Sequence, residues 1–230
     1  PERIKGDVKR IEDGGSFANS GRVFTNGEWT QTVFSNGITR SFYRGLDMTV
    51  PPESSFDEYA GVRIFAGDVG TKKPLPLTPS KVIYRDTCVT FVARYKGIVF
   101  THTTGTHPRL CGETHVLRVK NMTGHHKRVK LYVWVNPFLS DKKSGMSHPA
   151  FTKLFMTDRV YTEEKCAVVT KNDTQGGEIS LCGGLLHDDD VRVLTSNTEF
   201  FRGRPFGNAG FKAFDEIKSD ESSVYVLSVP

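Results

Sequence analysis

Short runs in which apolar and polar residues alternate recur along the chain, separated by Gly, Pro, Asn and Asp. Alternation with a period of two is typical of a β-strand with one buried face. Every second residue of 89–95 is apolar, and residues 98–103 form a further run after Lys96 and Gly97. The two runs therefore predict a β-hairpin that turns at Lys96 and Gly97.

Residues 117–121 and 129–135 predict a second strand pair, with a hairpin turn across residues 123–128. In the second run, Tyr132 and Trp134 alternate with four Val and Leu residues. Because both rings are large, we expect another sheet to cover part of their face.

Residues 154–161 and 166–170 predict a third hairpin, with its turn at residues 162–165. Helical periodicity over three turns, with a capping residue ahead of it, is absent from the sequence. The fold class is therefore all-β and antiparallel, with very little helix. A chain of 230 residues suits one such domain over residues 1–230.

Composition narrows the class of protein. Charged residues make up 25% of the chain and its mean hydropathy is −0.37, so it reads as a soluble protein without a membrane span. The net charge of +5 is mildly basic, and the cluster His125 to Arg128 reads as a solvated surface, so nucleic acid is not an expected partner. Four cysteines without a Cys-x-x-Cys pair predict reduced thiols and a cytoplasmic protein.

Catalytic and metal chemistry find little support. His102, His107, Cys111 and His115 are the one cluster that could hold zinc, but strand alternation predicts unrelated hairpin arms for His102 and His115. The acidic run 188–190 reads as a turn before a strand, and no nucleophile elbow or phosphate-binding glycine loop occurs. We expect no cofactor, no metal and no catalytic residue.

Sugars bind to flat aromatic faces beside planar hydrogen-bonding side chains. Trp29, Tyr43 and Arg44 lie near polar turns and are candidates for a carbohydrate or interdomain contact, with core or edge packing as the alternative for the two rings. Arg204 is a fourth candidate, for which a structural ion pair is the alternative.

Several motifs resemble a known family. The octapeptide 148–155 follows the strand pair, the motifs Asn26-Gly27-Glu28-Trp29-Thr30 and Tyr43-Arg44-Gly45-Leu46 open the pattern, and Phe201-Arg202-Gly203-Arg204 closes it. This order is similar to the N-terminal β-supersandwich domain of glycoside hydrolase family 94, most closely in cyclic β-1,2-glucan synthases. The resemblance implies an antiparallel β-supersandwich of two large stacked sheets. Ala66-Gly67-Asp68 departs from the family's Leu-Arg-Asp.

The resemblance implies a module without catalytic residues, beside an (α/α)6 barrel that carries the catalytic aspartate in a phosphorylase or β-glucan transglycosylase. It implies contact with a β-linked glucan and with the barrel, and a possible homodimer. The start at Pro1 and the end at Pro230 suggest a fragment or a separately made module. Phe151, Leu154 and Phe155 are expected in the core between the sheets.

Two other functions stay open. The chain could be an autonomous glycan-binding β-sandwich that uses Trp29 and Tyr43 on sheet-edge loops. A structural interaction domain is a weaker alternative, supported only by strand content and basic charge.

Overall fold

The computed structural model describes residues 8–13, 20–52, 60–68, 75–147, 152, 155–172, 177–184, 192–194 and 225–229. Its strands are β1 (Val8–Asp13), β2 (Gly21–Thr25), β3 (Trp29–Phe34), β4 (Thr39–Tyr43), β5 (Leu46–Thr49), β6 (Val62–Asp68), β7 (Leu75–Pro76), β8 (Lys81–Arg85), β9 (Val89–Tyr95), β10 (Ile98–Thr106), β11 (Glu113–Asn121), β12 (Val129–Val135), β13 (Pro137–Ser140), β14 (Met156–Tyr161), β15 (Cys166–Asn172), β16 (Glu178–Gly184), β17 (Arg192–Leu194) and β18 (Tyr225–Val229). One short helix, α1 (Lys142–Ser147), follows β13.

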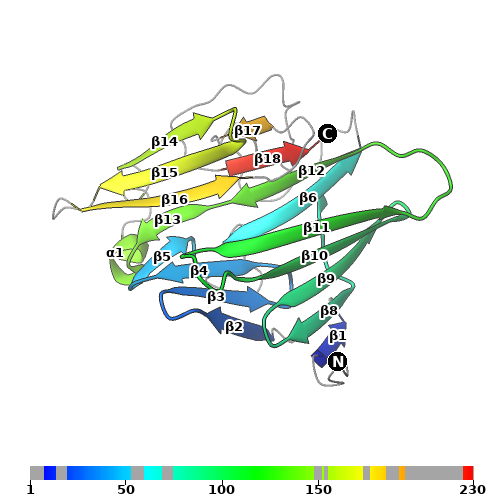
Figure 1. Cartoon of the computed structure of the whole chain (residues 1–230), viewed down its shortest axis with the longest axis horizontal. Coiled ribbons are helices and arrows are strands. Elements are labelled where there is room, and N and C mark those ends of the chain that lie inside the picture. Colours follow the sequence, from blue (N-terminus) through cyan, green and yellow to red (C-terminus); the bar gives the residue numbers. More distant parts are fainter. Residues whose placement is uncertain are drawn as a thin grey trace.

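The strands form three sheets (Figure 1). The five-stranded sheet has the order β1-β8-β9-β10-β11, and the three-stranded sheet has the order β14-β15-β16. The ten-stranded sheet follows the path β13-β5-β4-β6-β12-β18-β17, with β2 and β3 added beside β4 and with β7 beside β6. Every strand pair recorded among the described residues is antiparallel. The expected all-β, antiparallel class is confirmed.

Hydrophobic clusters join the ten-stranded sheet to both of the others. Phe24 and Val33 pack with Val82, Tyr84, Val89 and Phe91 of the five-stranded sheet. Trp29, Met48 and Leu139 pack with Met156, Ala167 and Val169 of the three-stranded sheet. The ten-stranded sheet is therefore the common layer against which the two smaller sheets stack, as a supersandwich requires.

Two predicted hairpins are confirmed. β9 and β10 pair with Tyr95 opposite Ile98, and Lys96 and Gly97 between them have φ of 47° and 79°. Two central residues with positive φ make the type I′ turn that matches the twist of the strands. β14 and β15 pair with Tyr161 opposite Cys166.

The predicted pairing of residues 117–121 with 129–135 is wrong. β11 pairs with β10 in the five-stranded sheet, whereas β12 pairs with β6 and β18 in the ten-stranded sheet. Residues 122–128 therefore cross between two sheets, because alternation identifies a strand but not its partner. Tyr132 and Trp134 are buried, since their side chains are 8% and 0% exposed.

The expected burial of Phe155 is also wrong, since this side chain is 62% exposed. Burial alternates along β14, where Met156 is buried and Thr157 is exposed. Phe155 has the outward parity, and Met156 fills the core position instead. Phe151 and Leu154 lie outside the described residues, as does most of the octapeptide.

We expect Met156→Ala to lower the free energy of unfolding by about 2 to 4 kcal/mol, because it empties a core position. Phe155→Ala should change it by less than about 1 kcal/mol, because surface side chains contribute little. Urea unfolding of both variants measures the difference. A larger loss for Phe155→Ala would show that its ring packs in the core after all.

The helix α1 has six residues. Within the described ranges, no helix is long and apolar enough to cross a membrane.

Candidate functional site

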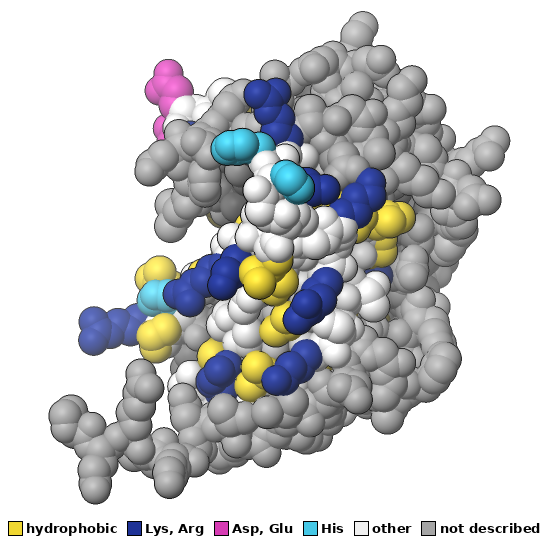
Figure 2. Space-filling model, turned by 90° about the vertical axis from the view of Figure 1, so that its right-hand side faces the viewer, with side chains coloured by type: hydrophobic (Ala, Val, Ile, Leu, Met, Phe, Trp, Pro, Cys, Tyr) yellow, Lys and Arg dark blue, Asp and Glu magenta, His cyan; other side chains and the backbone are white. Residues whose placement is uncertain are grey.

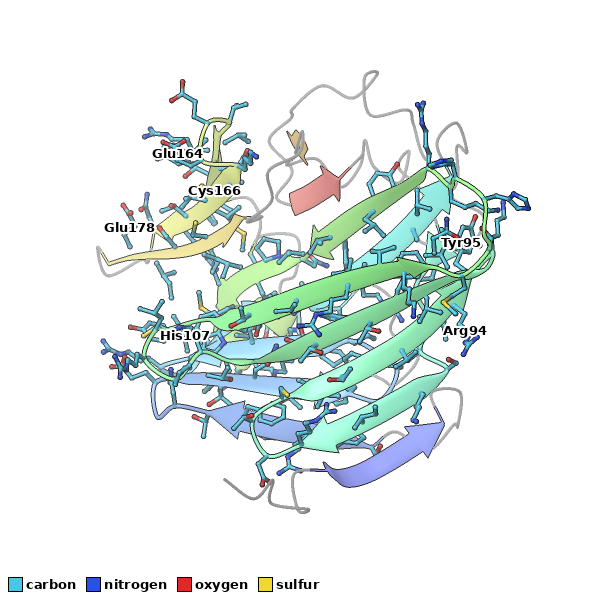
Figure 3. The ribbon with its side chains drawn as sticks, turned by 45° about the vertical axis from the view of Figure 1, so that its right-hand side comes forward. Arg94, Tyr95, His107, Glu164, Cys166 and Glu178 are labelled. Atoms are coloured by element: carbon cyan, nitrogen blue, oxygen red, sulfur yellow. The ribbon has the colours of Figure 1, made fainter. Side chains whose placement is uncertain are left out.

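Three connections meet at one end of the sandwich: the β2–β3 turn, the β4–β5 turn and the β10–β11 loop, which His107 marks in Figure 3. The Asn26 side chain joins the first connection to the third. Its Nδ2 donates to the carbonyl oxygens of His107 at 2.8 Å and Leu110 at 2.9 Å, while its Oδ1 accepts from the backbone N–H groups of Glu28 and Trp29. One asparagine therefore fixes the ten-stranded sheet against the five-stranded sheet at this end.

Four side chains form what we call the hairpin-end cluster: Glu28, Tyr43, Arg44 and Cys111. Arg44 Nη2 donates to Glu28 Oε1 at 2.6 Å, and Cys111 Sγ donates to Glu28 Oε2 at 2.9 Å. The Arg44 guanidinium lies 5.2 Å from the centre of the Tyr43 ring, which is within range of a cation–π contact. Arg44 and Gly45 have φ of 46° and 91°, so a type I′ turn presents the arginine.

Charge within this cluster is balanced. The hydrogen bond from Cys111, followed by that from Arg44, lowers the pKa of Glu28. The hydrogen bond to Glu28 raises the pKa of Cys111, so its thiol stays protonated at neutral pH. A protonated thiol is a poor nucleophile. The cluster is therefore suited to exchanging hydrogen bonds with hydroxyl groups rather than to covalent chemistry.

Beneath the cluster lies a chain of polar contacts that we call the buried relay: Trp29, Ser41, His102, Glu113 and His115. Glu113 Oε2 accepts from Ser41 Oγ at 2.8 Å and from Trp29 Nε1 at 3.4 Å. Glu113 Oε1 lies 2.9 Å from His115 Nε2, and His115 Nδ1 lies 2.9 Å from His102 Nε2. The relay joins β3 and β4 of the ten-stranded sheet to β10 and β11 of the five-stranded sheet.

Proton positions in the relay follow from its chemistry. A carboxylate only accepts hydrogen bonds, so His115 Nε2 carries a proton and donates a hydrogen bond to Glu113 Oε1. Which nitrogen donates in the contact between His115 Nδ1 and His102 Nε2 is set by the tautomers of the two rings. Burial, and after it the nearby His115, holds the pKa of His102 well below its ordinary value. His102 is therefore neutral at pH 7.

The expectation that His102 and His115 occupy unrelated positions is wrong. In the β10–β11 register Thr104 lies opposite His115 and His102 opposite Leu117, so both histidines point to the same inward face. Their rings stack with centroids 5.1 Å apart. The other two members of the predicted cluster bond elsewhere: His107 Nδ1 accepts from two backbone N–H groups, and Cys111 donates to Glu28. Across the described part of the chain, no group of three or more His, Cys, Asp or Glu could hold a metal ion.

The structure places the predicted contact residues Trp29, Tyr43 and Arg44 in different environments, and Arg204 is not among the residues it describes. Trp29 is only 4% exposed and belongs to the core, so its ring offers no face to a sugar, which corrects its place among the candidates. Its position on β3 has inward parity, as the burial pattern of that strand shows. Tyr43 is half-buried beside Trp29, with ring centroids 6.3 Å apart, and Arg44 is exposed.

Sequence reasoning missed Glu28, Ser41 and Glu113 as members of a site, and it named Cys111 only as a zinc ligand. A signal did exist for Glu113, because polar residues occupy the inward positions of β10 and β11 where apolar ones are usual. Nothing comparable marks Glu28 and Cys111, whose contact joins positions far apart in the chain.

A cavity of about 20 Å³ lies near the relay, with Arg63, Phe91, Phe100 and His102 among its lining residues. This volume has room for a water molecule. Sites for sugar-sized ligands usually have several hundred Å³. This place between the sheets is therefore too small for a sugar.

The low pKa of His102 predicts a loss of stability in acid. Below its ordinary value of 6.5 the unfolded chain takes up a proton that the folded chain refuses, so the contribution is complete above pH 6.5 and declines as pH falls. The slope is at most about 1.4 kcal/mol per pH unit for one proton. Urea unfolding at about pH 7.5 and pH 5.5 measures the decline.

His102→Gln, which retains a donor towards His115, should reduce that pH dependence. His126→Gln, at an exposed histidine, is the matched control and should leave it unchanged. An unaltered pH dependence in His102→Gln would assign the effect to another group.

Comparison with known proteins supplies a family. No curated protein matched the chain. The family model described as the glycosyl hydrolase 94 supersandwich domain matches residues 68–211, which include Cys111, Glu113 and His115. The opening motifs at residues 26–46 lie before this match and stay a resemblance. Because the match spans more than half of the 230 residues and the fold is an antiparallel supersandwich, this chain belongs to the glycosyl hydrolase 94 supersandwich family.

Proposed function

We propose that the chain is the non-catalytic module of a family 94 glycoside phosphorylase or β-glucan transglycosylase, of the kind that makes cyclic β-1,2-glucans. In this role it supports the active site of a helical-barrel catalytic domain and contacts a β-linked glucan. The observation that carries the proposal is the supersandwich match over residues 68–211 on an all-β fold.

The hairpin-end cluster is the proposed point of contact. Arg44 and Glu28 are 64% and 52% exposed in their side chains, and they offer donors and acceptors beside the Tyr43 ring. A cation, a carboxylate and an aromatic ring are the groups with which proteins hold sugar hydroxyls and C–H faces. Asn26 and the type I′ turn hold these groups on rigid hairpin ends, which limits the entropy lost on binding.

Independent turnover is not expected. Glycoside cleavage needs two carboxyl groups, or one carboxylic acid opposite phosphate, across the scissile bond. At the hairpin-end cluster Glu28 is held by Arg44 and Cys111, while Glu113 is enclosed in the buried relay with its side chain only 10% exposed. The purified chain should therefore release no glucose from β-glucosides, with or without phosphate.

The gene itself tests the module role against the autonomous glycan-binding protein. A reading frame that continues past the codon for Pro230 into helical repeats supports the module, whereas a stop codon there supports the alternative.

Titration with β-1,2-glucan oligosaccharides, followed by amide NMR shifts, tests the proposed contact. We expect shifts at Tyr43 and Arg44, and their loss in Arg44→Gln. Arg22→Gln is the matched control, because Arg22 also makes an ion pair, with Asp86, away from the cluster. Shifts that persist unchanged in Arg44→Gln, or glucose release that one carboxylate substitution abolishes, would overturn the proposal.

A further inference from the structure

The outward face of the five-stranded sheet concentrates positive charge. Lys81, Arg94, Arg118 and Lys120 are all exposed there, and we call them the basic face. No Asp or Glu occupies an outward position of β8, β9, β10 or β11, and no ion pair is recorded for these four residues with any described side chain.

The register sets the spacing of these cations. Arg94 lies opposite Val99, which lies opposite Lys120, and in the next row Thr101 lies opposite Arg118. Strands are about 4.8 Å apart and alternate residues about 7 Å apart. Arg94 and Lys120 are therefore roughly 10 Å apart, and Arg118 and Lys120 roughly 7 Å apart. Asp13 of β1 is the register partner of Lys81.

Between the cations lies a floor of short side chains. Val92, Val99 and Thr101 are half-buried and β-branched, so the floor is low and stiff. Val116, on the same outward side of β11, is 46% exposed, and Met122, just after the strand, is 58% exposed. Among the described residues, Figure 2 shows Lys and Arg side chains interleaved with hydrophobic ones on this side of the molecule, and the acidic side chains coloured in this view lie at its upper left.

We propose that the basic face docks onto an anionic lipid bilayer surface. A planar array of cations in two rows meets a planar layer of negative headgroups all at once, and the exposed aliphatic side chains can enter the headgroup region. This role is independent of the hairpin-end cluster, since Arg94 lies at the opposite end of the molecule from His107 (Figure 3).

Other partners fit the face less well. Protein interfaces are enriched in aromatic residues and depleted in Lys, and the outward positions of β8–β11 carry no aromatic ring. Single-stranded nucleic acid needs such rings for stacking, and a duplex meets a flat face along a narrow stripe. A second copy of the same face would be repelled by its like charge.

Co-sedimentation of the 230-residue chain with lipid vesicles tests the proposal. We expect binding to vesicles of phosphatidylcholine with phosphatidylserine, no binding to phosphatidylcholine alone, and weaker binding as salt is raised. The double variant Arg94→Gln/Lys120→Gln should lose about 30-fold in affinity, as expected for two cations at an anionic surface.

The matched control is Lys142→Gln/Lys143→Gln, which removes the same charge from the exposed face of α1. It should change the affinity by less than about threefold. Circular dichroism confirms that both double variants keep the fold. Equal losses in the two double variants, equal binding to neutral vesicles, or binding only to duplex DNA or to an acidic protein would overturn the proposal.

Discussion

Replacement of Glu113 by leucine should lower the free energy of unfolding by about 3 to 5 kcal/mol, the range found when one partner of a buried polar pair is removed. The carboxylate accepts hydrogen bonds from Ser41 Oγ, Trp29 Nε1 and His115 Nε2. Without it, three donors stay between the sheets with no acceptor, and each unmet donor costs about 1 to 3 kcal/mol. The three donors can partly rearrange in the variant, so the total loss of stability stays below the sum of the three separate costs.

Glu28→Leu is the matched control for this experiment. Glu28 also binds two partners, Arg44 and Cys111, but it does so in solvent, where water replaces the lost contacts. Its unfolding midpoint in urea should change little. If Glu28→Leu were as destabilising as Glu113→Leu, the stabilisation would come from the network as a whole and not from burial of the carboxylate.

The buried relay and the hairpin-end cluster meet at Trp29 and Tyr43. Trp29 donates to Glu113 below and packs against Tyr43 above, and the Tyr43 ring lies under the Arg44 guanidinium. Trp29 is therefore buried beneath Tyr43 and supports it, and Trp29 is not itself a surface residue. Of the two rings, Trp29 is buried and Tyr43 is half-buried, so the proposed contact rests on Tyr43.

Strand identity could be read from sequence because period-two alternation is a local signal. Residues 89–95 and 98–103 became a hairpin for a local reason as well, since the Lys96-Gly97 turn fixes the register. Residues 117–121 and 129–135 also became strands, but in different sheets, because pairing over a seven-residue connection depends on which partner edges are free.

Contacts between sheets were the part that could not be read. Cys111 meets Glu28, and Glu113 meets Ser41, only because the five-stranded and ten-stranded sheets stack in one particular offset. No local pattern encodes that offset. The prediction for Phe155 was wrong for a local reason. Side chains alternate between the two faces of β14, and the inward position belongs to the neighbouring Met156.

Gly61 is the backbone position where substitution should be most damaging. Its φ is +65°, and a Cβ atom there would lie 1.5 Å from the carbonyl oxygen of Thr39. Its N–H donates to the oxygen of Val50, and its own oxygen accepts from the N–H of Asn136. A side chain must therefore push β6 away from β4 at the place where the chain is held on both sides.

We expect Gly61→Ala to lower the free energy of unfolding by more than about 4 kcal/mol. Single substitutions cause losses of this size when they create steric clashes in the core or break buried hydrogen-bond networks. Gly27→Ala is the matched control, because Gly27 also has positive φ, +98°, but nothing lies within 4 Å of the added Cβ. That variant should lose only about 1 kcal/mol, the cost of the backbone conformation alone. Urea unfolding of the two variants separates close packing from conformational preference, and equal losses would mean that the contact with Thr39 relaxes without cost.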